Sequence, residues 1–428
     1  MRIRFYNVKI LTMEKDRPLF TGEVWTEENT ICYIGKPVEE SVLSTQEWDR
    51  QINGNGNLLM PGFKNAHTHS AMTFLRSYAD DLPLQEWLHQ QVFPMEAKLT
   101  PEDVYWLYRL AVMEYVTSGI TAVFDMYFLM EPGIEASIDC GFRSVMCGAL
   151  NDFCQSPEDL ERWYEKYQSY HELISFCLGF HAEYTTSEPL LRQVAALSHA
   201  YQAPVFTHNS ETEEEVRQCI QRNGVTPTVY LDQLGMFDYG GGGFHCVHMT
   251  EEDLDIFQKK GLSVVTNPAS NMKLASGIAP ISDMQKRGIS LAIGTDGPAS
   301  NNCLDMFREM FLTTALAKIR EKDASVADAD QVLFMATAGG AKAMGLTDCD
   351  VLAPGKKADM ILLDLHQPNM QPENHITKNI VYSGSKQNVK MTMVNGRILY
   401  EDGSFFLGEE AEKVYRMANR IIERIRKE

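Results

Sequence analysis

The spacing of the apolar positions changes near residue 57. Before that point, residues 2–11 and 22–35 are rich in strand-forming residues and Asn53-Gly-Asn-Gly56 forms a turn cluster, so short strands are predicted. After it, apolar runs of strand length alternate with amphipathic stretches, which is typical of βα units in a parallel sheet. The eight runs are Leu58–Ala66, Ala122–Phe128, Ser144–Leu150, Ile174–His181, Pro204–His208, Gly243–His248, Ser263–Asn267 and Ser290–Thr295.

Helix-starting signals lie between these runs. Thr100-Pro-Glu-Asp103 and Thr250-Glu-Glu-Asp253 each combine the hydroxyl and the acid of a capping box. Residues 304–322 and 328–344 supply the last long helices. Eight strand–helix units within residues 58–349 predict an α/β fold, a (β/α)8 TIM-type barrel with a catalytic mouth.

The two ends of the chain are predicted to form a second, smaller domain. Strands are expected again at Ala358–Leu365, Asn379–Tyr382 and Val389–Tyr400, the last with a turn at Asn395-Gly396. Neither end has enough strands to bury a sheet alone. We therefore expect residues 1–57 and 350–405 to build one composite β-sandwich, followed by a C-terminal helix over 406–428.

Composition narrows the class of protein. The chain has 428 residues, of which 44% are hydrophobic and 23% charged, as expected for a folded protein with a large core. The formal net charge of −19 disfavours nucleic acid and anionic membranes as partners. No apolar run approaches the length of a membrane span. A small-molecule substrate is expected, and a homo-oligomer is compatible with this composition.

Cysteine usage and the N-terminus indicate the compartment. The nine cysteines are scattered and include no Cys-x-x-Cys pair, so neither a disulfide framework nor a thiolate zinc site is predicted. The first residues alternate like a strand and lack the apolar stretch of a signal peptide. We expect a reducing, cytoplasmic location.

Several predicted strands end in residues that bind metals. Strand one ends in His67-Thr-His69, whose histidines at i and i+2 face the same side. His208 ends strand five, His245 lies in strand six, and Asp296 follows strand eight. Because a barrel gathers its strand ends at one mouth, we expect an N/O site for zinc or another divalent first-row metal. Strand four contains no lysine that could be carboxylated to bridge two ions, so one metal is expected.

An acidic residue follows the strand-five histidine closely in the sequence. Glu211 is three residues after His208 and would begin the next loop within reach of a substrate at the barrel mouth. A carboxylate there can shuttle a proton between water and a ring nitrogen or leaving group. The other acids of this run, at positions 213–215, fit the start of a helix. The glycines at 240–243 are predicted to form a flexible turn.

These residues belong to segments that resemble a known family. The segments are Pro61-Gly-Phe-Lys-Asn-Ala-His-Thr-His69, His208-Asn-Ser-Glu211, His245-Cys-Val-His248, Asn267-Pro-Ala-Ser-Asn271, Gly294-Thr-Asp-Gly297 and Pro354-Gly-Lys-Lys-Ala-Asp359. In this order they resemble the amidohydrolase superfamily over nearly the whole chain. They are most similar to its methylthioadenosine/S-adenosylhomocysteine deaminase branch.

The resemblance implies roles for individual residues. His67, His69, His208 and Asp296 would bind one divalent metal, with Zn²⁺ favoured and Fe²⁺, Mn²⁺ or Ni²⁺ as alternatives. Glu211 would be the proton shuttle, and His245 would orient the attacking water and the substrate, with Asp296 sharing in proton transfer. Glu96 matches a carboxylate aimed at ribose hydroxyls, and His181 matches a substrate-contacting histidine. The implied reaction is hydrolytic deamination of an adenosine-type nucleoside.

One departure from that branch concerns the substrate tail. Members that hold the amino-acid tail of S-adenosylhomocysteine use arginines in and after strand three, whereas residues 147–157 here contain neither Arg nor Lys. Arg143 lies near the start of that strand and is expected to point elsewhere. Adenosine, 5′-deoxyadenosine or methylthioadenosine is therefore favoured over S-adenosylhomocysteine.

Two other classes of protein fit parts of the pattern. Deaminases of free purine or pterin bases, and triazine amino- or chlorohydrolases, would use the same site, but Glu96 would then have no ribose to bind. A non-catalytic barrel would require a lost ligand or a lost acid, and none is missing.

Overall fold

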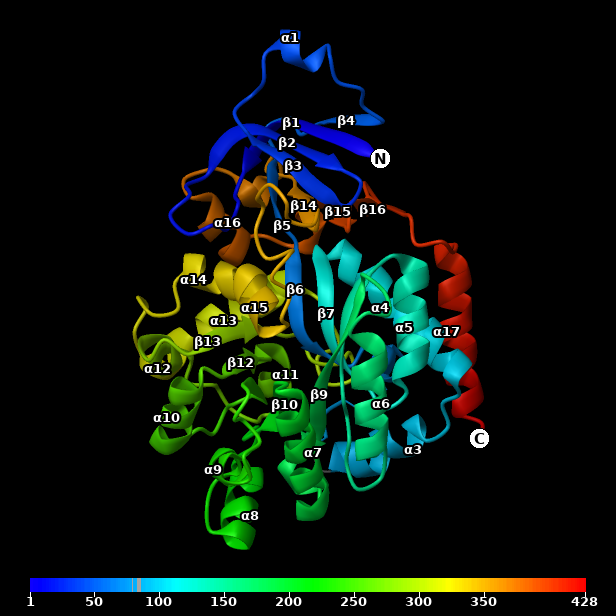
Figure 1. The fold of residues 1–428 in the computed structure, drawn as a ribbon, viewed down its shortest axis with the longest axis vertical. Helices are drawn as coiled ribbons and strands as arrows, with labels where there is room; N and C mark the ends of the chain where they lie inside the picture. The colour runs from blue at the N-terminus through cyan, green and yellow to red at the C-terminus, as the bar shows by residue number, and fades with distance from the viewer. Residues whose placement is uncertain (79, 83–85) are drawn as a thin grey trace.

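A mixed sheet lies above a barrel in the computed structural model, which describes residues 1–78, 80–82 and 86–428 (Figure 1). The barrel strands are parallel and neighbour one another in chain order. They are β6 (Phe63–Thr68), β7 (Ile120–Met126), β8 (Arg143–Cys147), β9 (Ile174–Ala182), β10 (Val205–Asn209), β11 (Gly241–His245), β12 (Ser263–Thr266) and β13 (Ser290–Ile293). The predicted (β/α)8 barrel is confirmed.

Side chains and one backbone bond join β6 to β13, the two ends of the hydrogen-bonded strand order. Asn65 Nδ2 donates to Thr295 Oγ1 at 2.7 Å, and Thr295 N donates to Asn65 Oδ1 at 2.8 Å. Asp296 N donates to the His67 carbonyl at 3.0 Å. These bonds connect the first and last strand ends, so His67 and Asp296 meet at the mouth.

Helices surround the barrel (Figure 1). The capping boxes at Thr100 and Thr250 are both formed, as predicted. The larger helices are α4 (Pro101–Thr117), α5 (Met130–Cys140), α6 (Pro157–Tyr167), α7 (Glu188–Tyr201), α8 (Glu213–Asn223), α9 (Pro227–Gln233), α10 (Glu251–Lys260) and α13 (Met306–Glu321). Shorter ones are η1 (Ser70–Leu75), η2 (Trp87–Val92), α3 (Phe93–Glu96), η3 (Glu183–Thr185), α11 (Pro268–Lys273), α12 (Ile281–Lys286), α14 (Ala329–Phe334), η4 (Met335–Gly339) and α15 (Gly340–Ala343).

Both ends of the chain contribute to the smaller domain, as predicted. Its strands form one mixed sheet in the order β17-β16-β15-β14-β5-β1-β2-β3, with β4 also paired to β1. The strands are β1 (Arg2–Ile10), β2 (Phe20–Glu27), β3 (Thr30–Gly35), β4 (Arg50–Asn53), β5 (Leu58–Pro61), β14 (Met360–Leu363), β15 (Val389–Val394), β16 (Arg397–Glu401) and β17 (Ser404–Phe405). The antiparallel pair β5–β14 joins the N-terminal and C-terminal parts. Short helices α1 (Glu40–Leu43), η5 (Pro368–Met370), α16 (Ile376–Tyr382) and η6 (Lys386–Asn388) connect them.

Three local predictions differ from the structure. The apolar run Leu58–Ala66 is two strands, β5 in the mixed sheet and β6 in the barrel, separated at Gly62, where a Cβ would lie 2.1 Å from Thr121 Cγ2. Residues 379–382, predicted as a strand, belong to helix α16. The glycine run is mostly strand β11 rather than a turn, because backbone approaches closely there: a Cβ on Gly242 would lie 2.1 Å from the Ser263 carbonyl oxygen.

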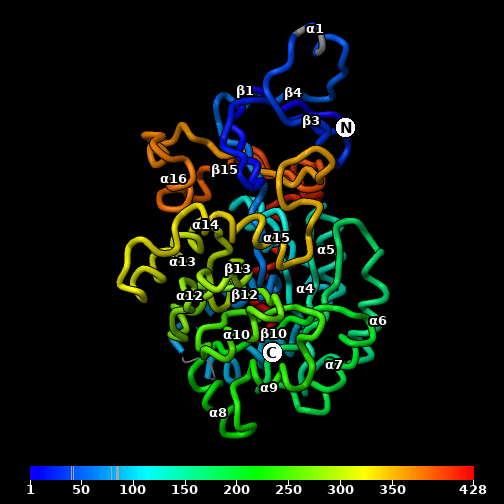
Figure 2. Tube along the Cα trace, turned by 60° about the vertical axis from the view of Figure 1, so that its left-hand side comes forward, coloured from blue at the N-terminus to red at the C-terminus, as the bar shows by residue number. Residues whose placement is uncertain are grey.

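An ion pair and a helix connect the parts of the molecule. Arg143 of β8 forms a two-point contact with Asp359 beside β14, Nε to Oδ2 at 2.6 Å and Nη2 to Oδ1 at 3.1 Å. Helix α17 (Ala411–Ile425) runs beside the barrel (Figure 1) and lies behind it in the turned view (Figure 2). Its Arg424 Nη2 lies 2.5 Å from Asp103 Oδ2 of α4. None of the helices in the described part of the chain combines the length and apolar character needed to span a bilayer.

Candidate active site

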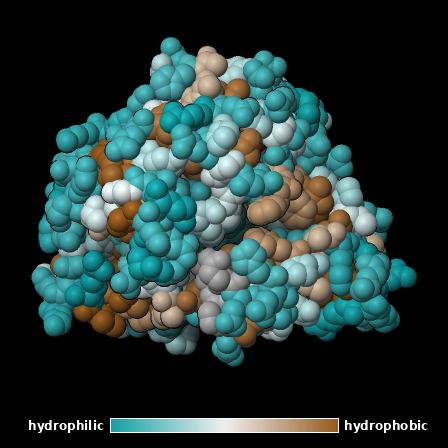
Figure 3. Space-filling view, turned by 90° about the horizontal axis from the view of Figure 1, so that it is seen from below, coloured by the Kyte–Doolittle hydropathy of each residue, from teal (hydrophilic) through white to brown (hydrophobic). Residues whose placement is uncertain are grey.

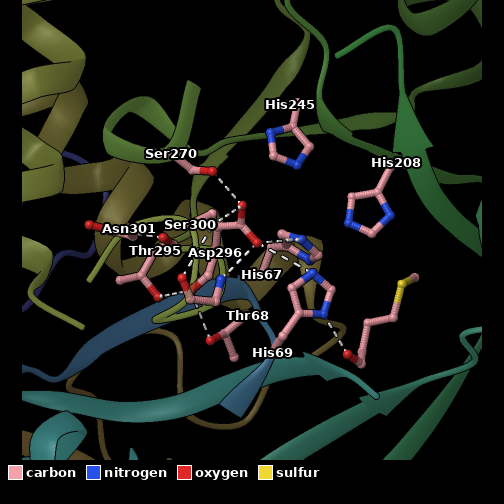
Figure 4. A network of polar contacts seen from close by, with 12 residues as sticks. His67, Thr68, His69, His208, His245, Ser270, Thr295, Asp296, Ser300 and Asn301 are labelled. Atoms are coloured by element: carbon pink, nitrogen blue, oxygen red, sulfur yellow. Dashed lines mark hydrogen bonds and ion pairs between the residues drawn. The ribbon is translucent and has the colours of Figure 1, made fainter. Parts of the chain in front are cut away.

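The predicted metal ligands meet at the carboxyl ends of the barrel strands (Figure 4). His69 Nε2 lies 3.3 Å from Asp296 Oδ1, and His67 Nε2 lies 3.7 Å from the same oxygen. The donor atoms form two overlapping groups, His67 with His208 and His245, and His67 with His69 and Asp296, each within 4.8 Å. Residues far apart in sequence thus converge on one point.

Three of the imidazoles are oriented by hydrogen bonds through Nδ1. His69 Nδ1 donates to the Met126 carbonyl at 2.6 Å, and His208 Nδ1 donates to the His181 carbonyl at 2.7 Å. His245 Nδ1 lies 2.7 Å from Asn271 Oδ1. A carbonyl oxygen only accepts, so Nδ1 carries a proton in these rings, and a metal would bind Nε2. Burial acts to lower the pKa of His69, but the hydrogen bond and charge of Asp296 raise it to about 9, so a metal at this Nε2 would take the place of a proton.

His67 is buried beneath the site, and its ring nitrogens form no hydrogen bond with the described residues. Its ring stacks on Phe244 with centroids 3.8 Å apart. It is fully buried, and neither ring nitrogen has a hydrogen-bond partner among the described residues. An unpartnered buried polar atom is costly, and the neighbouring nitrogen and carboxylate donors are those that zinc and related divalent ions prefer. The residues therefore fit a metal ion.

Asp296 is held in a strained conformation by several donors. Its φ of 58° is in the left-handed region. Oδ2 accepts from Ser270 Oγ at 2.5 Å and Ser300 Oγ at 2.8 Å, and Oδ1 accepts from Gly297 N at 2.7 Å. Burial acts to raise the pKa of Asp296, but the hydrogen bond and charge of His69 outweigh burial and hold it well below the usual range. Asp296 is therefore a carboxylate.

Glu211 faces this cluster from the loop after β10. It is 7% exposed, its Oε2 lies 3.8 Å from His245 Nε2, and its Oε1 accepts from Ser276 Oγ at 3.3 Å. Burial, with the nearby charge of Asp296, raises the pKa of Glu211, while His245 opposes the shift. A carboxyl group with a raised pKa can both accept and donate a proton near neutral pH.

Glu215 supports Glu211 in a way that the sequence analysis missed. Its Oε1 accepts from Ser210 N at 2.9 Å and its Oε2 accepts from Glu211 N at 2.8 Å. Glu215 is also the acid of a capping box with Thr212 at the start of α8. The sequence Thr212–Glu215 carries that signal, but only the fold shows that the carboxylate also accepts from the backbone N–H of Glu211.

The two predicted substrate contacts, Glu96 and His181, both line the cavity at the barrel mouth. Glu96, at the end of α3, is buried, its Oε1 has no hydrogen-bond partner among the described residues, and burial raises its pKa to about 7. His181, near the end of β9, is held by Thr185, with 2.9 Å between Nδ1 and Oγ1, and burial lowers its pKa to about 4. Its ring centroid lies 4.8 Å from that of His208.

A cavity of about 570 Å³ opens at this end of the barrel, which is large enough for a nucleoside. In the view of this end, apolar side chains gather beside a hollow (Figure 3). The described lining residues include no Lys or Arg. Arg143 is bound to Asp359 as described, and Arg76 is bound to Glu114 and the Asn302 carbonyl. The lining includes His69, Glu96, His181, His208, Glu211, His245 and Asp296, together with Met72, Trp87, Leu88, Phe93, Met126, Tyr127, Phe128, Asn151, Phe153, Cys154, Tyr184, Leu274 and Ser300.

Comparison with known proteins agrees with this geometry. The model of the amidohydrolase family matches residues 58–399, and the chain belongs to that family. It is 43% identical over 373 residues to a 5-methylthioadenosine/S-adenosylhomocysteine deaminase of Syntrophomonas wolfei, with 86% of each chain covered. It is 36% identical over 398 residues to a 5′-deoxyadenosine deaminase of Methanopyrus kandleri, covering 91% of this chain and 92% of the relative.

A solved structure shares the whole fold. The crystal structure of an adenosine deaminase from Xanthomonas campestris with bound zinc superimposes with a TM-score of 0.92 at 30% identity, covering 100% of this chain and 98% of that one. The resemblance to the amidohydrolase superfamily that the motifs indicate is thereby confirmed, as is the barrel with a smaller sheet domain.

Proposed function

We propose that this protein is a metal-dependent hydrolytic deaminase of adenosine-type nucleosides. The observation that carries the proposal is the position of Glu211, which shares one buried cavity with the His/Asp cluster and with Glu96. A shuttle acid, a set of metal-binding donors and a carboxyl group suited to a sugar are what hydrolysis at C6 of a nucleoside requires. The names of the relatives support the same activity.

The proposed metal ligands are His67, His69, His208 and Asp296, with one zinc ion. When bound, the metal lowers the pKa of water and makes a nucleophile available at neutral pH. The unpartnered His67 nitrogens and the Nε2 atoms of the other rings support this assignment. The zinc-bound structural neighbour supports zinc over other divalent ions.

The proton transfers follow from the positions of three side chains. Asp296 and His245 receive the proton of the attacking water while its oxygen forms a bond with C6. Glu211 protonates the adjacent ring nitrogen, and the carboxylate so formed then takes the proton of the new C6 hydroxyl and passes it to the departing amine. The first water proton, held by Asp296 and His245, returns to Glu211 and restores its starting state. The C6–N bond breaks and ammonia leaves, so the nucleoside and one water give the inosine-type product and one ammonia.

The sugar and its 5′ substituent are recognised at the outer part of the cavity. Glu96 would bind the ribose hydroxyls, and its unpartnered Oε1 supports that role. His181 would contact the substrate near the metal. Because the described lining contains no Lys or Arg, a carboxylate on the 5′ substituent would lose water without gaining a permanently charged cation, and His89, which also lines the cavity, offers only an imidazole. We therefore propose neutral substrates such as adenosine, 5′-deoxyadenosine and methylthioadenosine.

The cellular location, the absence of nucleic-acid partners and the domain limits are also proposals. All nine cysteines are free thiols, several of them buried, which supports a reducing cytoplasmic compartment. The net charge of −19 supports the absence of nucleic-acid partners. The domain limits proposed from the sequence, 1–57 with 350–405, 58–349 and 406–428, are retained with Leu58–Pro61 added to the smaller domain, since β5 pairs with β14.

The experiment that tests the proposal is ammonia release from a substrate panel by the zinc-reconstituted protein. The panel contains adenosine, 5′-deoxyadenosine, methylthioadenosine, S-adenosylhomocysteine, adenine, guanine and a pterin. Turnover confined to the neutral nucleosides is expected. Preference for S-adenosylhomocysteine would refute the argument from the missing cation, and activity only on free bases would refute the role of Glu96.

A further inference from the structure

Glu309 is a buried carboxyl group that the proposed chemistry does not use. It lies in the first turn of α13 and is fully buried. Burial raises its pKa to about 8. No salt bridge to it is formed within the described part of the chain; its partners are two N–H groups. A carboxyl group is rarely buried without a cation, so the two hydrogen bonds that Glu309 accepts need an explanation.

Those contacts reach two separate loops of the barrel mouth. Glu309 Oε2 accepts from Ala269 N at 3.1 Å, in α11 after β12. Glu309 Oε1 accepts from Asn301 Nδ2 at 2.8 Å, in the loop after β13. Asn301 Nδ2 also donates to the carbonyl of Thr295 at 2.6 Å, and Thr295 directly precedes Asp296.

The residues next to these contacts are the serines that hold Asp296. Ser270 follows Ala269, and Ser300 precedes Asn301; both hydroxyls donate to Asp296 Oδ2 (Figure 4). The carboxyl group of Glu309 therefore holds the Ala269 backbone beside Ser270 and the Asn301 side chain beside Ser300. Such outer contacts set the direction of a metal ligand, and losing one typically lowers metal affinity or activity by about 10–100-fold.

We infer that Glu309 is a positioning residue for Asp296, joining the loops after β12 and β13 so that Ser270 and Ser300 aim the carboxylate at the metal. The inference rests on the metal site of the proposed function. Glu309 acts through Asp296, because Glu309 itself is not among the residues that line the cavity. Glu309→Gln leaves one acceptor oxygen and puts an amide NH2 against the other donor, so one of the two loops is released.

The test measures the zinc Kd by competition with a chromophoric chelator, beside kcat and KM for 5′-deoxyadenosine. For Glu309→Gln we expect the zinc Kd to rise by about 10–100-fold and kcat at limiting zinc to fall, with KM within about twofold of wild type. Glu309→Ala should have a larger effect, and the glutamine variant keeps the test valid if the alanine variant does not fold.

Asp305→Ala is the matched control. Asp305 caps the same helix by accepting from Phe307 N at 3.0 Å and from Arg308 N at 3.5 Å, and it contacts neither loop serine. Its removal weakens α13 without releasing the loops, so a zinc Kd within about twofold of wild type is expected.

Two results would overturn the inference. One is an unchanged zinc Kd in Glu309→Gln, and the other is an equal loss in Asp305→Ala, which would assign the effect to helix stability. The zinc measurement is independent of the substrate. A wild-type protein that binds zinc but deaminates no nucleoside would refute the proposed function, while weaker zinc binding in Glu309→Gln would still support the positioning role.

Discussion

Replacing Glu211 with glutamine tests the proposed chemistry most directly. The amide has nearly the same size and can keep the hydrogen bond from Ser276 Oγ, which lies 3.3 Å from Oε1 in the wild type. It cannot carry a proton between water and the purine ring. Because Glu211 belongs to neither group of metal-binding donors, we expect the zinc content to be unchanged.

The size of the effect follows from the surroundings of the carboxyl group. A positioned acid–base residue contributes about 10²–10⁴-fold to a rate. Glu211 is 7% exposed and its Oε2 lies 3.8 Å from His245 Nε2, so solvent has little access to replace it. We therefore expect kcat to fall by about 10³-fold, which is ~4 kcal/mol of transition-state stabilisation, with a small change in KM.

The assay is ammonia release from saturating methylthioadenosine, with zinc measured on the same samples. Glu213→Gln is the control, because Glu213 belongs to the same acidic run, is exposed, and starts α8. It should turn over at the wild-type rate. Turnover of Glu211→Gln within about threefold of wild type, at equal zinc content, would refute the proton-shuttle assignment.

Four further predictions concern the sugar, the metal and the joint between the domains. Glu96→Ala should raise nucleoside KM by about 10–100-fold through the loss of hydrogen bonds to a charged group, and steady-state kinetics showing unchanged KM would contradict the ribose role. Chelation should abolish ammonia release and lower the melting temperature, zinc should restore both, and a chelated protein of full activity would exclude a metal requirement. Arg143→Met should lower the free energy of unfolding by about 3–5 kcal/mol in urea, because it leaves Asp359 buried without its cation, and a loss below about 1 kcal/mol would contradict that reasoning. Burial acts to raise the pKa of the Asp359 carboxyl group, but Arg143 holds that pKa below the usual range. The contribution of the carboxylate to the free energy of unfolding is therefore present above about pH 4 and is lost as the pH falls through the lower pKa of the folded state. Asp359→Asn should abolish this part of the loss of stability in acid.

Left-handed backbone at the strand ends accompanies the active site. Ser210, His245, Cys246 and Asp296 have φ values of 52°, 70°, 48° and 58°. These conformations are unfavourable for residues other than glycine, and they turn the chain sharply where the side chains must point into the mouth. Asn271 Oδ1 accepts a hydrogen bond from His245 Nδ1, and Ser270 Oγ donates one to Asp296 Oδ2; these two bonds hold the His245 and Asp296 side chains in place.

Much of the site was predictable because its residues occupy strand ends. Periodicity identifies parallel strands, the barrel places their carboxyl ends at one mouth, and metal-binding residues at those ends must then lie close together. The absence of cations after strand three could also be seen in the sequence. The structure adds that Arg143, the nearest candidate, is bound to Asp359.

Tertiary structure decided the features that depend on which segments pack together. A continuous apolar run cannot show where the chain leaves one sheet for another, so the break at Gly62 depends on the close approach of Thr121. Residues 379–382 carry apolar residues compatible with strand or helix, and packing selects α16.

The sequence by itself determined the barrel and the family, and it supplied the candidate site residues, because these follow from local periodicity and from residue types at strand ends. It did not determine how Asp296 is aimed. Ser270, Ser300 and Glu309 lie in three different segments, and none has a motif that marks it as a support. Their contacts arise only when β12 and β13 pair side by side and bring the segments that follow them together, because hydrogen bonds between distant segments depend on three-dimensional distance rather than on spacing along the chain.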